Sequence, residues 1–172
     1  MLKLISKSTK ELSTNNIKEI CRLKDTQWKF GLKSQRNWFK NNVQSYDIHN
    51  CFYIRNLLIG YTLLKKRKLE ISGKKMNYLL FDILIIRKNL RKKKLSYLMM
   101  LFNNNVIKRN KKISFLLCKN ELISFYKKFH WKKLNKKKLK IMDHTFDTNG
   151  MLFNCTTKFS KIKKPIKIYF NK

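Results

Sequence analysis

The chain has 172 residues, enough for one domain with a single apolar core and too few for two domains of ordinary size. Hydrophobic residues make up 43% of it and aromatic residues 13%, which excludes an intrinsically disordered protein. Its 42 Lys and Arg against 9 Asp and Glu give a formal net charge of +33, which would ordinarily indicate a polyanionic partner. Alanine is absent and residues with A/T-rich codons abound, so we attribute much of the lysine to genome composition. Anionic ligands should still be drawn to this surface, most strongly at low salt.

The four cysteines are widely spaced, with no C-x-x-C pair and no histidine at zinc spacing: Cys21, Cys51, Cys118 and Cys155. We therefore expect reduced thiols, with neither a disulfide framework nor a metal site. The apolar start of the chain is too short for a signal peptide, and no apolar run approaches the ~20 residues of a membrane-spanning helix. These features predict a cytoplasmic protein with no membrane partner.

The first expected elements are a strand, two helices and a strand meander. Residues 2–6 alternate like a short strand, and residues 13–15 offer caps for a helix that we expect to end near Leu23. A second helix is expected over residues 34–42. Two strands follow around a tight turn, at residues 51–55 and 58–64, the second continuing or turning through the basic segment 65–75.

The middle of the chain carries the strongest apolar patterns. Residues 77–86 form a near-continuous apolar run, which predicts a central strand covered on both faces. Residues 95–107 place apolar side chains on one helical stripe, and a strand is expected over 113–118. Asn120 is placed to cap a further helix that we expect to end near Phe129.

The last third is less regular. Trp131 should begin a strand, the lysine-rich residues 132–140 look like a turn or exposed hairpin, and residues 151–157 look like a late strand. We expect one domain over residues 1–157, with 158–172 as a basic C-terminal tail or last edge strand.

Two segments resemble the GNAT N-acetyltransferase superfamily. Residues 84–99, Leu-Ile-Ile-Arg-Lys-Asn-Leu-Arg-Lys-Lys-Lys-Leu-Ser-Tyr-Leu-Met, are similar to the family's buried strand and the Q/R-x-x-G-x-G/A loop that opens a helix. Residues 115–131 look like its strand-and-helix unit that ends in an F-Y-x-x-F-G-F type signature. The resemblance implies an α/β (α+β) fold with a mixed, mostly antiparallel central sheet, splayed near its centre, and helices on both faces.

Physical chemistry alone makes the loop in residues 84–99 a candidate phosphate site, because backbone N–H groups at a helix N-terminus attract anions. The resemblance implies that the pyrophosphate of acetyl-CoA, or of another acyl-CoA, is held by Arg91, Lys92, Lys93, Lys94, Leu95 and Ser96. It also implies that backbone groups of Ile85 and Ile86 bond the pantetheine. The family usually has small residues where Lys94 and Ser96 stand, and a solvated basic loop before a core helix is the alternative.

The resemblance implies that Tyr126 protonates the departing thiolate, and the alternative is a half-buried aromatic with a structural hydroxyl. Asp82 lies in an apolar strand, where an unpaired carboxylate is costly, so it should face a cleft, a partner or water. It is the first candidate for the general base, and a structural ion pair with a lysine is the alternative. His130 stands where the family often has glycine, and we expect a left-handed helix cap there.

The remaining candidates are the acceptor site and a metal site. The acceptor amine should be bound by the first two helices and their connection, around Trp28, Gln35, Trp38 and Asn41, although such aromatic residues are more often core. Three other side chains could be imagined as metal ligands but are too loosely spaced: Asp143, His144 and Asp147. The presumed reaction requires no metal.

The predicted function is transfer of an acetyl or other acyl group from a coenzyme A thioester to a primary amine by direct attack. The acceptor could be an amine-bearing small molecule, an amino sugar or a protein N-terminus. Two alternatives stay open. A basic protein that binds RNA or ribosomes would use the high charge for non-specific nucleic-acid binding. A GNAT fold without catalysis would follow from Lys94 in the phosphate loop.

Overall fold

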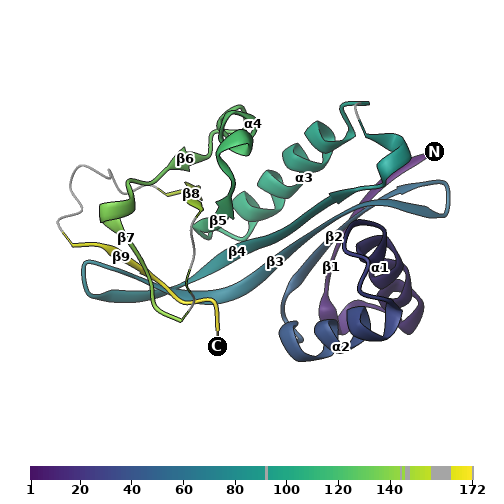
Figure 1. The fold of residues 1–172 in the computed structure, drawn as a ribbon, viewed down its shortest axis with the longest axis horizontal. Helices are drawn as coiled ribbons and strands as arrows, with labels where there is room; N and C mark the ends of the chain where they lie inside the picture. Colours follow the sequence, from purple (N-terminus) through teal and green to yellow (C-terminus); the bar gives the residue numbers. More distant parts are fainter. Residues whose placement is uncertain (92, 144, 146–147, 156–163, 172) are drawn as a thin grey trace. The chain divides into compact units, whose positions relative to one another are not determined.

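The computed structural model describes residues 1–91, 93–143, 145, 148–155 and 164–171. The chain divides into two compact units: the first comprises Met1–Lys65 and Asp82–Asn103, and the second Lys66–Phe81 and Asn104–Lys172. Two long strands, β3 (Leu57–Ile71) and β4 (Lys74–Ile86), contribute to both units. Figure 1 follows the elements along the chain.

In the first unit, four strands are neighbours in the order β1, β2, β3, β4. β1 (Leu2–Ser8) pairs antiparallel with β2 (Ile48–Ile54), which pairs antiparallel with β3. A bulge between Phe52 and Tyr53 shifts the β2–β3 register opposite Gly60. A Cβ at Gly60 would lie 2.8 Å from Ile86 Cδ1, so the glycine permits the close approach of these strands.

Two consecutive helices cover one face of this sheet. α1 (Thr14–Gln27) begins at Ser13, whose hydroxyl accepts from the backbone N–H of Asn16 at 3.1 Å while the Asn16 amide oxygen accepts from the backbone N–H of Ser13. The predicted cap is confirmed, and the helix runs one turn beyond Leu23. α2 (Leu32–Asn42) follows Gly31, whose φ of 82° makes the tight link between the helices possible.

The strands of the first unit bury side chains on both faces, as the apolar run of β4 predicts. Ile83 and Ile85 pack with residues of α1, α2 and β3 in one cluster. Leu84 and Ile86 alternate to the other face, where they meet Met99 of α3 (Leu95–Arg109). Figure 1 shows α1 and α2 on one side of the first unit's strands and α3 on the other. This is the expected arrangement of helices on both faces.

The second unit is also built on strands. β5 (Ser114–Cys118) pairs parallel with β4 at Leu79↔Ser114 and Leu80↔Phe115, and antiparallel with β8 (Asn149–Phe153). The two-residue β6 (Lys132–Lys133) extends this sheet beyond β8. The sheet is therefore mixed and mostly antiparallel, as expected.

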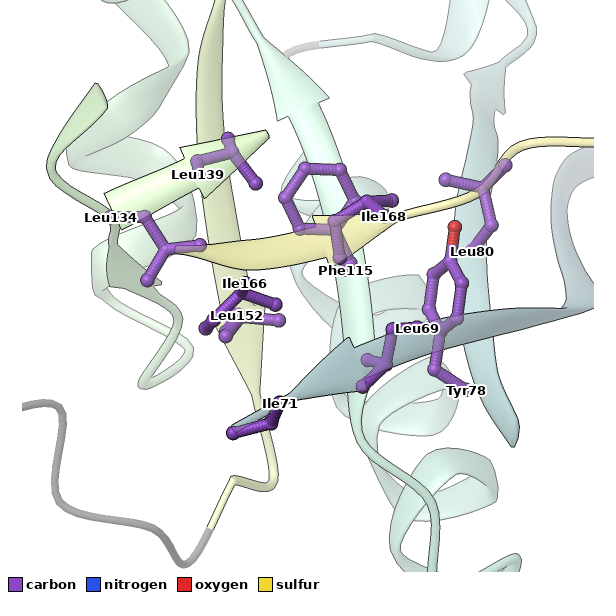
Figure 2. Packing of buried hydrophobic residues seen from close by; sticks show 10 residues of the cluster. All are labelled: Leu69, Ile71, Tyr78, Leu80, Phe115, Leu134, Leu139, Leu152, Ile166 and Ile168. Atoms are coloured by element: carbon purple, nitrogen blue, oxygen red, sulfur yellow. The ribbon is translucent and has the colours of Figure 1, made fainter. Parts of the chain in front are cut away.

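A short late strand, β9 (Ile166–Ile168), lies between two partners. It pairs antiparallel with the distal part of β3 and parallel with β7 (Leu139–Ile141). Ile166 and Ile168 are fully buried in a cluster that Figure 2 draws around Tyr78 and Phe115. The lysine-rich segment 132–140 thus contains short strands and two buried leucines, Leu134 and Leu139, rather than an exposed hairpin alone.

The predicted helix near residue 120 is shorter than expected, and its cap is wrong. Residues Asn120–Leu122 form a 3-10 turn, and α4 covers Ile123–Lys127 without a capping side chain. The Asn120 side-chain oxygen accepts instead from the amide of Asn149 at 2.8 Å. Among the helices within the described residues, none is long and apolar enough to cross a membrane.

Candidate functional site

A pocket of about 260 Å³ opens between α1, α2 and β4 in the first unit. We call it the Lys24 pocket, and it is lined by Lys24, Trp28, Phe30, Ser34, Gln35, Trp38, Asp82 and Ile83. It brings the predicted general base, Asp82, next to Trp28, Gln35 and Trp38, which are distant from it in the sequence, whereas Asn41 does not line it.

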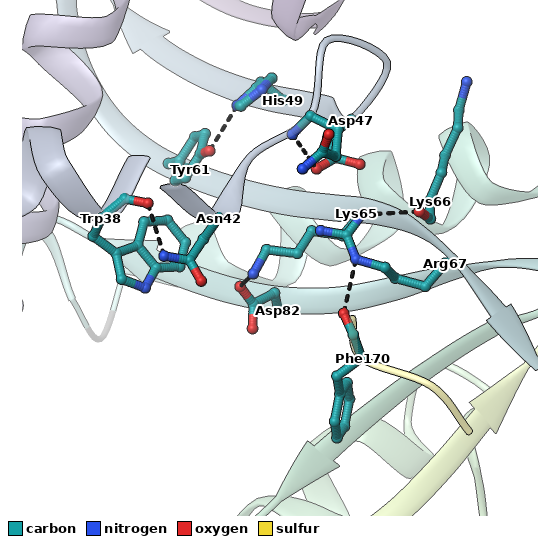
Figure 3. Close-up of polar contacts among 11 residues, drawn as sticks. Trp38, Asn42, Asp47, His49, Tyr61, Lys65, Lys66, Arg67, Asp82 and Phe170 are labelled. Carbon is teal, nitrogen blue, oxygen red and sulfur yellow. Dashed lines mark hydrogen bonds and ion pairs between the residues drawn. The ribbon is translucent and has the colours of Figure 1, made fainter. Parts of the chain in front are cut away.

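Two charged residues line the Lys24 pocket, Lys24 of α1 and Asp82 of β4, and Lys65 of β3 lies beside them. Asp82 of β4 forms an ion pair with Lys65, whose Nζ lies 2.7 Å from Asp82 Oδ2. Figure 3 shows these two side chains directed at each other. The ion pair that was the alternative reading of Asp82 therefore exists, while 29% of the Asp82 side chain is exposed. The Lys24 ammonium lies 3.1 Å from the centroid of the Trp38 ring, and that of Lys65 lies 4.8 Å from it. Such contacts stabilise cations over aromatic faces.

Lys24 is the residue that the sequence reasoning missed. It is 3% exposed, and burial lowers its pKa to about 8, because removal of water disfavours the charged form. At pH 7 roughly nine tenths of a group with that pKa is protonated. A signal for it was present: Ile17, Ile20, Cys21 and Lys24 follow the i, i+3, i+4, i+7 spacing of the buried stripe of α1.

Gln35 has a structural contact in addition to its place in the pocket wall. Its side-chain amide donates to the backbone carbonyl of Trp28 at 2.7 Å, and it is 3% exposed. The Gly31 N–H donates to the Asp25 carboxylate at 2.8 Å. These bonds fix the link between α1 and α2, which carries Trp28 and Phe30.

The chain enters α3 through a residue in the left-handed conformation. Lys94 has φ of 56°, the left-handed conformation that favours glycine, and its carbonyl accepts from the N–H of Tyr97 at 3.0 Å. The N–H groups of the first helical residues, Leu95 and Ser96, have no acceptor within the helix, and no acidic residue stands in the first turn. The segment therefore fits an anion. Lys92 lies outside the described residues.

Arg91 is engaged with the protein on two sides. Its Nε donates to the backbone carbonyl of Ile86 at 3.1 Å, and its Nη2 donates to the side-chain oxygen of Gln27. The guanidinium thus links the end of β4 to the last residue of α1. Because it has five donors, groups remain for a phosphate.

Ile85 and Ile86 lie at the end of β4 with buried side chains. The described pairing of β4 with β5 covers Leu79 and Leu80, and β4 runs on to Ile86. Their predicted role concerns backbone groups alone, and the Ile86 carbonyl already accepts from Arg91.

Tyr126 lies in the second unit among aromatic rings, which we call the Tyr126 cluster: Phe81, Phe125, Tyr126, Phe129, Trp131 and Phe153. It is 8% exposed, and burial raises its pKa well above the ordinary value. A phenol is protonated at neutral pH with or without this shift, and the raised pKa makes Tyr126 a weaker acid than an exposed tyrosine.

Other predicted features have clear outcomes. His130 has a φ of 64°, so the expected left-handed conformation is confirmed, but it lies in the turn after α4, whose C-cap is Lys128. Asp143 accepts from the backbone N–H groups of Phe170 and Asn171, whereas His144 and Asp147 lie outside the described residues. In the described part of the chain, no group of three His, Cys, Asp or Glu side chains could hold a metal ion. The four cysteines are free thiols.

No family model and no curated protein matches this sequence. Solved structures do share its fold. Escherichia coli ElaA is 14% identical, with 88% of this chain and 99% of that chain covered and a TM-score of 0.61. An acyl-CoA N-acyltransferase from Pseudomonas aeruginosa is 12% identical over 88% and 99%, with a TM-score of 0.65. The GNAT family N-acetyltransferase YhbS from Escherichia coli, solved in complex with CoA, is 9% identical over 98% and 91%, with a TM-score of 0.66.

The chain therefore has the fold of the GNAT acyl-CoA N-acyltransferases, and the fold class expected from residues 84–99 and 115–131 is confirmed.

Proposed function

We propose that the protein is an N-acyltransferase that moves an acetyl or other acyl group from coenzyme A to a primary amine. The observation that carries the proposal is the Lys24 pocket, which gathers Trp28, Gln35, Trp38 and Asp82 on a GNAT fold. The structure of YhbS, which shares the fold, contains CoA.

The residues divide the work as follows. The helix N-terminus at Leu95 and Ser96, with Arg91 and the neighbouring lysines, holds the pyrophosphate by backbone N–H groups and positive charge. Asp82 attracts the acceptor ammonium and takes up its proton, directly or through water. The amine nitrogen attacks the thioester carbonyl, the C–S bond breaks, and Tyr126 donates a proton to the departing sulfur. The nitrogen then loses its second proton, which passes through water and restores the Tyr126 phenol.

Calorimetry with CoA and acetyl-CoA tests the first part. We expect saturable binding of both, together with an increase in thermal stability that grows with ligand concentration. Because the net charge of +33 attracts any polyanion, ATP serves as the control ligand. Equal binding of ATP and CoA, lost together as salt rises, would instead favour the nucleic-acid alternative.

A matched pair of variants locates the binding. Ser96→Glu places a negative charge at the proposed phosphate site, where it is compatible with the helix dipole, so the helix should form and CoA binding should be lost. Asn105→Glu makes the same charge change at an exposed position further along α3 and should leave binding intact. Retained CoA binding in Ser96→Glu would contradict the site. CoA binding without turnover over a broad amine panel would identify a fold without catalysis.

A further inference from the structure

The charge of the Lys24 pocket is unusual for a site that binds an amine. Its lining contains one ammonium group, of Lys24, and one carboxylate, of Asp82, which is already paired with the ammonium of Lys65 outside the lining. Within the described residues Lys24 forms no ion pair, and its ammonium lies against the Trp38 ring. One positive charge in the pocket is therefore not neutralised.

This charge balance disfavours polycationic acceptors. A polyamine, an aminoglycoside or a lysine-rich peptide would bring several positive charges toward Lys24 and Lys65, with one shared carboxylate to offset them. Like charges repel strongly in a partly dehydrated pocket. An acceptor that carries its own negative charge would meet Lys24 favourably.

The walls of the pocket are aromatic. Trp28 and Phe30 are 38% and 72% exposed, although large apolar side chains are ordinarily withdrawn from water, and Trp38 and Ile83 continue the apolar lining. The exposed rings stand at the rim on the link between α1 and α2. The volume of about 260 Å³ is at the small end for ligand pockets, which run from about 300 to 1,000 Å³. A single ring on a short chain suits it better than an oligosaccharide or a long peptide.

We infer that the acceptor is an α-amino acid with an aromatic side chain, its carboxylate bonded to Lys24, its amino group near Asp82 and its ring against Trp28 and Phe30. The inference rests on the proposed function for the reaction, but not for binding. In that reaction the amino nitrogen forms a C–N bond to the acyl carbon and the thioester C–S bond breaks. The ammonium loses two protons, one to Asp82 and one that replaces, through water, the proton given to sulfur, which leaves an N-acyl amino acid and free coenzyme A.

Binding of small probes to the full chain tests the class. L-phenylalanine is compared with 2-phenylethylamine, which lacks the carboxylate, with glycine, which lacks the ring, and with spermidine, a polycation. Calorimetry should show that phenylalanine binds about tenfold more tightly than 2-phenylethylamine, the scale of one charge-assisted contact. The affinity for phenylalanine should also exceed the affinities for glycine and spermidine. Equal affinity for phenylalanine and 2-phenylethylamine, or tighter binding of spermidine, overturns the inference.

Two variants assign the selectivity to residues. Lys24→Met keeps the length and apolar stem of the side chain and should abolish the preference for phenylalanine over 2-phenylethylamine. Lys18→Met, on the exposed side of the same helix, is the matched control and should keep that preference. Trp28→Ala should narrow the difference between phenylalanine and glycine. A preference that survives in Lys24→Met contradicts the assignment.

Parallel calorimetry with CoA separates the two proposals. Binding of CoA without selectivity for phenylalanine overturns the acceptor class and leaves the acyltransferase proposal standing. Selective binding of phenylalanine without binding of CoA overturns the acyltransferase proposal and leaves the ligand class of the pocket standing. When both bind, incubation with acetyl-CoA should yield N-acetylphenylalanine by mass spectrometry.

Discussion

The Lys24 pocket and the Tyr126 cluster each bury one titratable side chain among aromatic rings, yet their surroundings differ. The pocket sets Lys24 beside a second ammonium and a carboxylate, with exposed rings at its rim. Tyr126 contacts Phe81, Phe125 and Trp131. One region places charged groups beside exposed rings, and the other resembles a hydrophobic core.

The comparison shows one physical cause acting in two directions. Removal from water lowers the pKa of Lys24 to about 8 and raises the pKa of Tyr126, because burial disfavours the charged form of either group. Lys24 nevertheless stays mostly protonated at neutral pH and can receive an anion. Tyr126 keeps its proton and can donate it. Each prediction below alters one of the two regions.

The largest effect is expected on stability in the Tyr126 cluster. Trp131 is 1% exposed, stacks on Phe153 with ring centroids 5.3 Å apart, and donates to the Asn104 side chain at 3.1 Å. Trp131→Ala should lower the free energy of unfolding by about 3–5 kcal/mol, the usual cost of removing a buried large aromatic side chain. Urea denaturation measures it. Trp28→Ala, at the pocket rim, is the control, and a similar loss there would show that the rim is part of the core.

A smaller effect, on catalysis alone, is expected from the Tyr126 hydroxyl. Tyr126→Phe keeps the ring contacts and removes the proposed proton donor, so acyl transfer should slow by about a hundredfold or more. CoA binding and unfolding should change little. The rate is measured as release of the CoA thiol from acetyl-CoA, with an amine that the wild-type protein acetylates. An unchanged rate would assign Tyr126 to packing and leave the thiolate without this donor.

The pH dependence of stability isolates Lys24. Its pKa is 10.5 in ordinary surroundings and about 8 in the fold, so between these values the unfolded chain binds more protons than the folded chain. The contribution of Lys24 to stability therefore rises with pH over that window, by about 1 kcal/mol per pH unit. Buried tyrosines and cysteines change stability in the opposite direction at high pH, so the comparison is with Lys24→Met. The stability difference between wild type and Lys24→Met should shift in favour of wild type from pH 8 to 9.5, whereas a constant difference contradicts the lowered pKa.

The smallest effect is expected from the ion pair at the base of the pocket. A double-mutant cycle of Lys65→Met and Asp82→Asn should give a coupling energy of about 1 kcal/mol, because the pair is close but partly exposed. Denaturation of the four proteins measures it. A coupling near zero would mean that Asp82 is available to an acceptor at no cost to the fold.

The regular elements were predictable because apolar spacing reports burial. The continuous apolar residues of β4 and the apolar residues on one face of α3 each indicate a single type of element. Ser13 caps α1 through a local contact, which the sequence shows directly. Asn120 failed as a cap because its amide oxygen bonds Asn149, a residue brought near by tertiary structure. Local patterns cannot show such a partner.

The candidate site was predictable in part. Trp28, Gln35, Trp38 and Asp82 were chosen from a family resemblance, and they line one pocket. Lys24 was missed because lysine is abundant in this chain, and a lysine on a helix is ordinarily predicted to be exposed to solvent. Its burial depends on packing between α1 and β4, although its position on the stripe with Ile20 and Cys21 was visible.

The position of β9 has a practical consequence for handling the protein. Residues near the C-terminus look dispensable from their lysine content, yet Ile166 and Ile168 fill the interior between β3 and β7. Trimming the chain before Pro165 would expose Leu69 and Leu139 to water and leave two strand edges open to other molecules. A shortened version should therefore aggregate.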